Sequence, residues 1–551
     1  MHSAIIIPVL YSWSSAWVAA SSYAGTASCR NIPGDAGWPV KNAWDSLNTT
    51  VAGRLIATSP AAHVCHDPTF SDAACKSVSQ EWDLQPFMTS QPGEILSTWF
   101  QNQSCNPFTP RASPCQLGNY ASYIINVSSI ADITAGLQFS QQNNIRLVIK
   151  NSGHDFYGKS TGKGALSLWT RNLNNKQLIS AYDSSYYRGP AIKLGAGVTG
   201  GDAAKFASQN GYRIVAGSCP TVGLVGGFTQ GGGHSFLSGL YGFGADNVLE
   251  WEVVLASGEH VVATPTQYQD LYWALSGGGG GTYGVVVSMT VRVFPEGQTA
   301  IASLSFNVTT AGGVDKFWGA VGTFLTETKL IVDDHGIVAA SGITNDTLGV
   351  IGMFAPGLNK TALTSLLKPL ISALAKKGIS AQAANLVVSD SPSYYALNSS
   401  AIVAGIKAAT DGGKFTVSAV ALNAKGQGRA IAPVASNSVQ PAFLDAYLSL
   451  IFSATWSLDQ PWSDATKLQD KFANSIMPVL EAATPGAGAY NNEANWEQPN
   501  FQQTFYGSTY DKLKLIKKIY DPQNVFYGLT AVGSEAWAPD AQGRLCRTGA
   551  A

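Results

Sequence analysis

The segment Gly223-Leu-Val-Gly-Gly-Phe-Thr-Gln-Gly-Gly-Gly-His234 constrains the fold of this chain more than any other. Glycines spaced this closely let successive backbone N–H groups point into one concavity, an arrangement that suits a pyrophosphate. A loose loop is the alternative interpretation, but Val225 and Phe228 inside the run, and the strand predicted soon after it, favour an ordered turn. Gly277–Gly281 is a second place where backbone could approach a ligand closely.

The chain has seven cysteines, and an odd number leaves at least one thiol without a partner in the same chain. Cys219 stands alone in the middle of the sequence, whereas the other six lie before residue 116 or near the C-terminus. Three disulfides and one sulfur committed to other chemistry is the simplest arrangement. Six cysteines allow many pairings. The pairing we favour has local loops Cys65–Cys75 and Cys105–Cys115, with Cys29–Cys546 joining the ends.

Composition indicates a large globular protein and gives no sign of a nucleic-acid or membrane partner. A chain of 551 residues is too long for one ordinary core, so two domains or one large composite are expected. The net charge of −1 gives no basic excess that would indicate a nucleic-acid partner or an anionic membrane surface. No stretch is long and apolar enough to predict a membrane helix. We expect no nucleic-acid or membrane partner, and a monomer.

The N-terminus is typical of a secretory signal, because Ala4–Leu10 is apolar and small residues follow at Val18-Ala19-Ala20. No Lys or Arg precedes the apolar run, so a buried N-terminal strand is the alternative. We predict a signal peptide over residues 1–20 and a secreted, extracellular protein. Glycosylation sequons support export and begin at Asn48, Asn102, Asn126, Asn307, Asn345, Asn359 and Asn398.

The composition and the predicted secondary structure change along the chain. Residues 21–116 hold five cysteines and many Pro, Ser and Asn, which predicts an irregular, disulfide-linked segment. From 117 to 297 strands and helices alternate around the glycine motifs, in a β-α-β rhythm that occurs twice. Residues 298–484 keep an α+β pattern without those motifs. The predicted strands are Tyr123–Val127, Arg146–Lys150, Ile192–Gly195, Arg213–Ala216, Asn247–Leu255, His260–Ala263 and 282–295; the predicted helices are Ser129–Asn143, Gly201–Asn210, Thr361–Lys377, Ser463–Ala483 and Lys512–Tyr527.

Three segments resemble common functional motifs, but none of them supports the function that its motif usually indicates. Gly195–Gly200 matches G-x-G-x-x-G, but the next predicted strand does not end in the acidic residue that would hold a ribose, so a nicotinamide dinucleotide site is not predicted. Gly233-His234-Ser235 lacks the final glycine of a hydrolase nucleophile elbow. A metal site at His63-Val-Cys65-His66 is disfavoured because a secreted, cysteine-rich segment favours a disulfide at Cys65, and we predict no metal.

The glycine motifs resemble, in order, those of the berberine bridge enzyme-like branch of the vanillyl-alcohol-oxidase superfamily. The resemblance covers about 120–296 and recurs near 485–530, and the C-terminal tail is similar to secreted fungal members such as isoamyl alcohol oxidases. One departure is Asn151, which stands where the family pattern has a doubled glycine before the histidine. The matching segments are Asn151–Asp155, Gly217–Gly223, Gly226–Gly233, Ala245–Leu249, Gly279–Gly284 and Asp521–Phe526.

This resemblance implies an α+β fold with a PCMH-type FAD-binding domain of two subdomains. A substrate domain with an antiparallel sheet covered by helices would follow it. The implied division is a signal peptide at 1–20, a disulfide-rich segment at 21–116, the FAD-binding domain at 117–297, the substrate domain at 298–484, and a C-terminal berberine-bridge-like segment at 485–551 that returns to the FAD domain.

The resemblance also implies FAD bonded twice, through its 8α-methyl group to His154 and through ring C6 to Cys219. In the family, two bonds raise the flavin potential and favour hydride abstraction from poor donors. A small Val at the position of Val222 accompanies oxygen reactivity there. The other cofactor-binding residues implied are Ser152, Gly153, Gly226, Gly227, Gly231, Gly232, Asn247, Val248, Gly284 and Asn524.

The implied activity is that of an oxidase that abstracts hydride from a C–H beside an alcohol or amine and passes electrons to O2, giving H2O2. The substrate would be an alcohol, a sugar or a secondary metabolite. Tyr490 is the predicted catalytic base, with Asn492 and Glu493 as neighbours, although the usual Y-R-D continuation is absent. The alternatives are oxidative or redox-neutral cyclisation in secondary metabolism, a dehydrogenase that does not use O2, or a secreted carbohydrate-binding protein without flavin.

Overall fold

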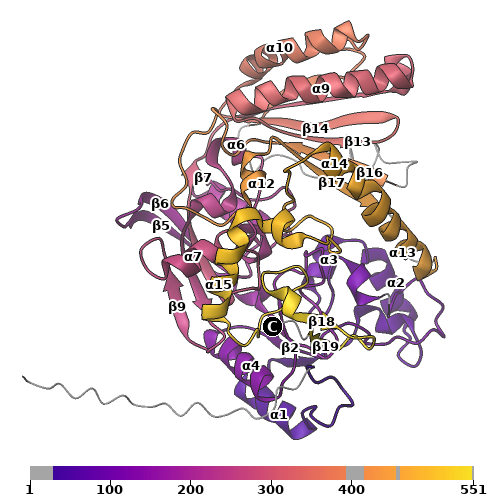
Figure 1. Ribbon diagram of the computed structural model, residues 1–551, viewed down its shortest axis with the longest axis vertical. Helices are drawn as coiled ribbons and strands as arrows, with labels where there is room; N and C mark the ends of the chain where they lie inside the picture. The colour runs from indigo at the N-terminus through magenta and orange to yellow at the C-terminus, as the bar shows by residue number, and fades with distance from the viewer. Residues whose placement is uncertain (1–28, 103, 392–414, 455–459, 549–551) are drawn as a thin grey trace, which may run out of the picture.

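The computed structural model describes residues 29–102, 104–391, 415–454 and 460–548. The predicted signal peptide and the sequon at Asn398 lie outside these ranges. Within them the chain has the predicted α+β architecture, with three main sheets and helices packed around them (Figure 1). Among the described helices, none is long and apolar enough to cross a membrane.

The first sheet contains a parallel β-α-β unit. β2 (Tyr123–Asn126) and β3 (Leu147–Lys150) both pair in parallel with β4 (Leu166–Trp169), and β1 (Leu55–Ala57) pairs antiparallel with β2. α4 (Ile130–Gln142) connects β2 to β3 as predicted, and the Ser129 hydroxyl accepts the Asp132 N–H in a capping box. This unit brings the chain from β3 directly into the turn that holds His154.

The second sheet has five antiparallel strands, which run in the order β5-β6-β10-β8-β9. Its helices include α5 (Gly200–Gln209), α7 (Gln269–Leu275) and α15 (Tyr510–Tyr520), whose apolar sides share its core. The strands are β5 (Lys176–Asp183), β6 (Arg188–Gly195), β8 (Val248–Val254), β9 (His260–Ala263) and β10 (Val285–Arg292).

The second predicted β-α-β unit was wrong. β7 is only Tyr212–Arg213, and it pairs antiparallel with β11 (Phe294–Pro295) instead of joining the sheet of β6. Both edges of β6 are already taken, one by β5 and the other by β10, so no hydrogen-bonding edge is left for β7. The chain therefore passes from β7 into the Cys219 turn outside that sheet.

The third sheet has six antiparallel strands in the order β15-β12-β14-β13-β16-β17. α9 (Val314–His335) and α10 (Lys360–Lys376) cover one face with buried Phe and Leu side chains, at the top of Figure 1. On the other face, Val338 and Val420 pack in a cluster that also contains Phe243, Phe443 and Tyr490. The strands are β12 (Thr299–Asn307), β13 (Val338–Ile343), β14 (Thr347–Pro356), β15 (Val387–Ser391), β16 (Phe415–Ala421) and β17 (Leu448–Ala454).

Several shorter helices complete the structure. The helix predicted over Ser463–Ala483 is divided by a π-helical turn at Phe472–Ile476, directly before Pro478. Proline has no backbone N–H and cannot donate the hydrogen bond of a regular helix. A π-helical turn before it accommodates that missing bond. The short helices of this part of the chain are α6 (Ser238–Tyr241), α8 (Val308–Ala311), α12 (Pro441–Asp445), α13 (Trp462–Lys471) and α14 (Met477–Ala483).

The N-terminal segment is more regular than the sequence predicted. It holds α1 (Lys41–Thr50), α2 (Asp72–Glu81) and α3 (Gln85–Ser90), which are short and whose polar composition hid them. All three favoured disulfides are present: Cys65–Cys75, Cys105–Cys115 and Cys29–Cys546. The last of these joins the N-terminal segment to the hairpin of β18 (Trp537–Pro539) and β19 (Leu545–Arg547).

Candidate functional site

A cavity of about 310 Å³ lies where the first two sheets and the C-terminal segment meet. His154 reaches it from the turn after β3, where Gly153 adopts a left-handed φ of +81°. A side chain at Gly153 would also crowd the Glu94 backbone and Lys150, so this turn requires glycine. Burial lowers the pKa of His154 to about 4, and its imidazole is therefore neutral near pH 7.

Thr221 brings His154 and Cys219 together. Its Oγ1 lies 2.7 Å from Nε2 of His154 and 3.5 Å from Sγ of Cys219. The Thr221 hydroxyl donates to Oε1 of Gln85 at 3.1 Å, so it accepts from His154, and Nε2 carries the ring proton. Among the described residues no hydrogen bond is made to Nδ1 of His154, which keeps its lone pair.

Gln85 is a part of this cluster that sequence reasoning missed. It lies at the start of α3, and its Oε1 accepts from the Cys219 thiol at 2.9 Å as well as from Thr221. Cys219 is the free cysteine among the described residues. The N-terminal disulfide-linked segment therefore contributes a side chain to the cavity, which no local motif signals.

The two glycine clusters predicted to approach a ligand meet at the cavity. A Cβ at Gly280 would lie 3.0 Å from the Cα of Gly227, so the two backbones are in contact. A Cβ at Gly227 would meet only Oδ1 of Asn492 at 4.0 Å, and one at Gly281 would meet nothing within 4 Å. Both positions line the cavity, so side chains there would fill it.

Most of the predicted cofactor-binding residues lie around this cavity, and five do not line it. Gly231 and Gly232 lie under the 490–492 segment, where a Cβ would strike Asn492 or approach Val439. Asn247 is buried in the scaffold and accepts a hydrogen bond from Arg292. The predicted residues that line it are Ser152, Gly153, His154, Cys219, Val222, Gly226, Gly227 and Gly284; those that do not are Gly231, Gly232, Asn247, Val248 and Asn524.

The predicted base, Tyr490, is buried at one wall of the cavity and stacks on Phe443 with ring centroids 4.8 Å apart. Its phenol oxygen accepts the Asn492 amide at 2.7 Å and the Gly233 N–H at 3.2 Å. Burial, followed by the charge of Glu493, raises the pKa of Tyr490 far above its ordinary value. The phenol therefore holds its proton at physiological pH.

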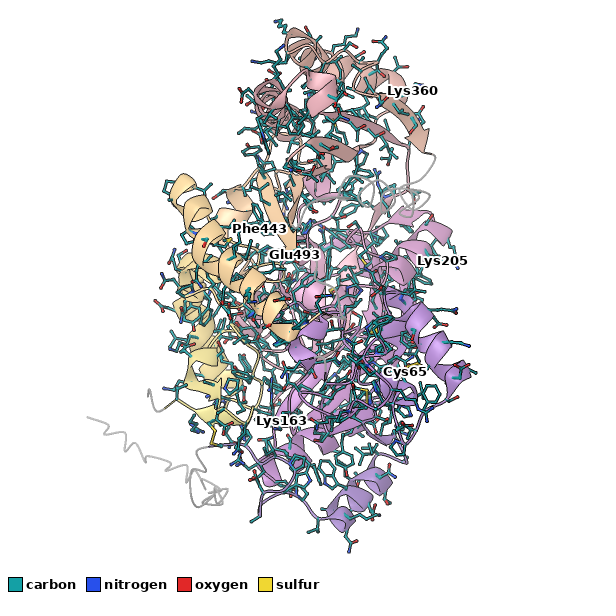
Figure 2. The ribbon with its side chains drawn as sticks, turned by 90° about the vertical axis from the view of Figure 1, so that its right-hand side faces the viewer. Cys65, Lys163, Lys205, Lys360, Phe443 and Glu493 are labelled. Atoms are coloured by element: carbon teal, nitrogen blue, oxygen red, sulfur yellow. A yellow bond between two sulfur atoms is a disulfide. The ribbon has the colours of Figure 1, made fainter. Side chains whose placement is uncertain are left out.

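His234 and Glu493, which were not predicted as a pair, also line the cavity. Nε2 of His234 lies 3.3 and 3.2 Å from the two carboxylate oxygens of Glu493. The two residues are 259 positions apart in sequence, and the fold alone brings them together. Glu493 lies in the middle of the molecule, close below Phe443 (Figure 2).

Comparison with known proteins identifies the family. Residues 121–264 match the family model described as FAD binding domain, and residues 489–532 match the one described as berberine and berberine like. The chain is 44% identical over 94% of its length to VAO-type flavoprotein oxidase VAO615 of Thermothelomyces thermophilus, and the match covers 95% of that protein. The chain belongs to the VAO-type, berberine bridge enzyme-like family of FAD-linked oxidoreductases.

Relatives within this family differ in what they do. The chain is 41% identical, over 95% of its length and 96% of the relative, to the bifunctional decalin synthase calF of Penicillium decumbens. The crystal structure of MtVAO615 from Myceliophthora thermophila C1 superposes with a TM-score of 0.87 at 42% identity, covering 94% of this chain and 100% of the other. Glucooligosaccharide oxidase from Acremonium strictum, described with 6-S-cysteinyl, 8α-N1-histidyl FAD, shares the fold alone at 19% identity and a TM-score of 0.59, over 75% of this chain and 92% of that one.

The cavity fits a flavin dinucleotide on its own residues. The open glycine backbone at Gly227 and Gly281 leaves room for a flat, extended group beside the chain. A neutral imidazole and a thiol converge within hydrogen-bond reach of one hydroxyl at the same place. His154, Cys219 and the glycine backbone are thus the groups that would hold FAD.

Proposed function

We propose that this protein is a secreted, monomeric oxidase that holds FAD through bonds to both His154 and Cys219. The observation that carries the proposal is the convergence of these two side chains on the Thr221 hydroxyl, in a cavity lined by open glycine backbone. A neutral imidazole with a free Nδ1 is the form of histidine that can bond to an electrophilic carbon. Disulfides such as Cys105–Cys115 support an oxidising, extracellular location.

The reaction we propose is oxidation of a C–H bond beside a hydroxyl or amine. Bound FAD would take the hydride from that carbon and pass two electrons to O2, giving H2O2. The chain's own part is to orient the substrate, exclude water and accept the proton that leaves the hydroxyl or amine. Tyr490, Asn492, His234 and Glu493 supply the polar groups on that side of the cavity, and Val222 lines it as well.

The naming of a relative as an oxidase supports this assignment, and a second candidate rests on another relative. The decalin synthase named above favours a cyclisation in secondary metabolism, in which the flavin would oxidise or merely bind an intermediate. A dehydrogenase that uses another electron acceptor is a third form of the same chemistry.

Purified protein should be incubated with panels of aliphatic alcohols, aromatic alcohols, amines and oligosaccharides while O2 and H2O2 are measured. We expect equal amounts of O2 consumed and H2O2 released with at least one class. Turnover only with an artificial electron acceptor would favour the dehydrogenase. Tightly bound flavin that no panel member reduces would contradict the oxidase and favour the cyclisation.

A further inference from the structure

His234 and Glu493 form a hydrogen-bonded pair inside the cavity. His234 ends the glycine run, and Glu493 follows Tyr490 on the opposite segment. The side chains are 17% and 24% exposed, so they are largely withdrawn from bulk water while still open to the cavity. A partly buried imidazole–carboxylate pair at a ligand cavity is typical of groups that move a proton.

The carboxylate fixes which ring nitrogen of His234 carries the proton. An ionised carboxylate can only accept hydrogen bonds, so Nε2, which contacts both Glu493 oxygens, must be the protonated nitrogen. Nδ1 then keeps its lone pair. Nδ1 has no hydrogen-bond partner among the described residues. It is also not among their fully buried polar atoms that lack a partner, so it remains accessible. It is therefore the nitrogen left to meet a molecule in the cavity.

The surroundings hold the ring in place. Tyr490 contacts it edge-on with centroids 5.4 Å apart, and Phe443 does so at 6.3 Å. Among the described residues, Glu493 and Tyr490 are the titratable groups in contact with the imidazole. Burial acts to lower the pKa of His234, but the charge and hydrogen bond of Glu493 outweigh it and leave that pKa raised, which makes the ring a stronger proton acceptor.

Tyr490 is less suited to accept the proton. Its oxygen already accepts two N–H donors, and its own hydrogen points toward the Phe228 carbonyl at 3.5 Å. Because its pKa is raised by burial, a phenolate that could act as a base is scarce near pH 7. Tyr490 therefore keeps its proton, donates toward the Phe228 carbonyl and packs against the ring of His234.

We propose that His234, oriented by Glu493, is the base that accepts the proton of the substrate hydroxyl or amine. The inference rests on the proposed oxidase function and refines it. In this step the substrate O–H or N–H bond breaks and its proton moves to Nδ1, while the bonding electrons stay on the heteroatom. They form the C=O or C=N bond as the adjacent C–H bond breaks, and that carbon would give its hydride to bound FAD, the two-electron acceptor of the proposed function. The imidazolium is stabilised by Glu493 and returns the proton to solvent between turnovers.

The first test measures the protonation of the His234 ring nitrogens and needs no substrate. The flavin-loaded protein carrying ¹⁵N-histidine is titrated by NMR, and the His234 signals are assigned by their loss in His234→Gln. We expect Nε2 to be protonated and Nδ1 bare above the titration, and Glu493→Gln to lower the pKa of His234. His260→Gln, at an exposed position on β9, should leave these signals unchanged. A proton on Nδ1, or a titration that Glu493→Gln does not move, would overturn the proposal.

The second test uses whichever alcohol or amine the oxidase panel identifies. His234→Ala should slow anaerobic flavin reduction by about 10²–10⁴-fold, and added imidazole should restore part of the rate. Tyr490→Phe should cost about tenfold or less. Full activity in His234→Ala beside a large loss in Tyr490→Phe would return the role to Tyr490. If no panel member is oxidised, the proposed function fails, while the NMR result still decides whether the pair is arranged as a base.

Discussion

At the scale of residues, the site depends on one hydroxyl that touches both proposed attachment points. Thr221 accepts a hydrogen bond from His154, contacts Cys219, and donates a hydrogen bond to Gln85. This chain of bonds sets the tautomer of His154 and leaves Nδ1 free. Loss of the hydroxyl should disturb the attachment of flavin more than the fold, because Thr221 lies in a turn and not in the core.

Thr221→Val tests that arrangement. Valine keeps the size of the side chain but removes the hydrogen bonds of the hydroxyl, so we expect the protein to fold and to carry a smaller covalently bound fraction of flavin. The measurement is the flavin that remains with the polypeptide after acid precipitation. Thr134→Val on α4, which alters a hydroxyl remote from the cavity, is the matched control. A covalent fraction equal to that of the unaltered protein would show that Thr221 does not orient His154.

Single residues also show what the sequence could and could not predict. His154 and Cys219 lie in glycine-rich motifs that identify them as candidate site residues. Ser129 was predicted from its residue type as the N-cap of its helix. Gln85 has no such motif, and nothing in the glycine run or beside Tyr490 marks His234 and Glu493 as a pair. Gln85 is 134 positions from Cys219, and Glu493 is 259 from His234, so their roles arise only after distant elements pack together.

At the scale of elements, β3 fixes the His154 turn through its last residue, Lys150. This side chain is 1% exposed, donates to the Gln91 carbonyl at 2.6 Å, and lies 5.1 Å from the Trp169 ring centroid. It thereby ties the N-terminal segment to the end of the strand. Burial lowers the pKa of Lys150 to about 7, against the opposing charges of Glu94 and Asp155.

This lowered pKa makes stability depend on pH. Between about pH 7 and about pH 10, the unfolded chain holds a proton on Lys150 that the folded chain has released, so the free energy of unfolding rises with pH. In Lys150→Met this contribution is absent, and its stability deficit relative to the unaltered protein should grow from pH 7 to pH 9. Urea unfolding at several pH values measures it, with Lys376→Met at an exposed site of α10 as control. A deficit that stays constant with pH would contradict the assignment.

Elements also differ in how well the sequence predicts them. β2, α4 and β3 are consecutive and locally patterned, so the sequence predicts these elements. The sequence did not predict β4, which lies between the two strands and pairs in parallel with both. β7 was predicted as a strand of a second such unit, but its place depends on which edges β5 and β10 leave free. Such pairing depends on the whole sheet and cannot be predicted from the residues Tyr212–Arg213 alone.

At the scale of the whole molecule, the two ends of the described chain are held together. Cys29 and Cys546 are bonded across 517 positions, and the Asp35–Arg544 ion pair at 2.7 Å lies beside them. The C-terminal segment thereby closes over the sheet that carries His154, and Leu147 of β3 bridges to Phe526. The cavity is thus bounded by residues from the beginning, middle and end of the sequence.

Removal of this disulfide should destabilise the protein more than removal of a local one. In the loop-closure account a cross-link stabilises more as its loop grows; a loop of about 15 residues contributes about 3 kcal/mol, and one of about 100 residues or more contributes about 5 kcal/mol. We expect Cys29→Ser with Cys546→Ser to lower the free energy of unfolding by about 5 kcal/mol. Cys65→Ser with Cys75→Ser, whose bridge spans 10 positions, is the control and should cost less. An equal or larger loss in the control pair would contradict this prediction.

The most direct test of the central claim is a peptide mass map of acid-denatured, protease-digested protein. We predict one flavin that joins the peptide containing His154 to the peptide containing Cys219, and flavin on the His154 peptide alone in Cys219→Ala. Flavin on neither peptide, in protein produced with ample FAD, would contradict the account of this site.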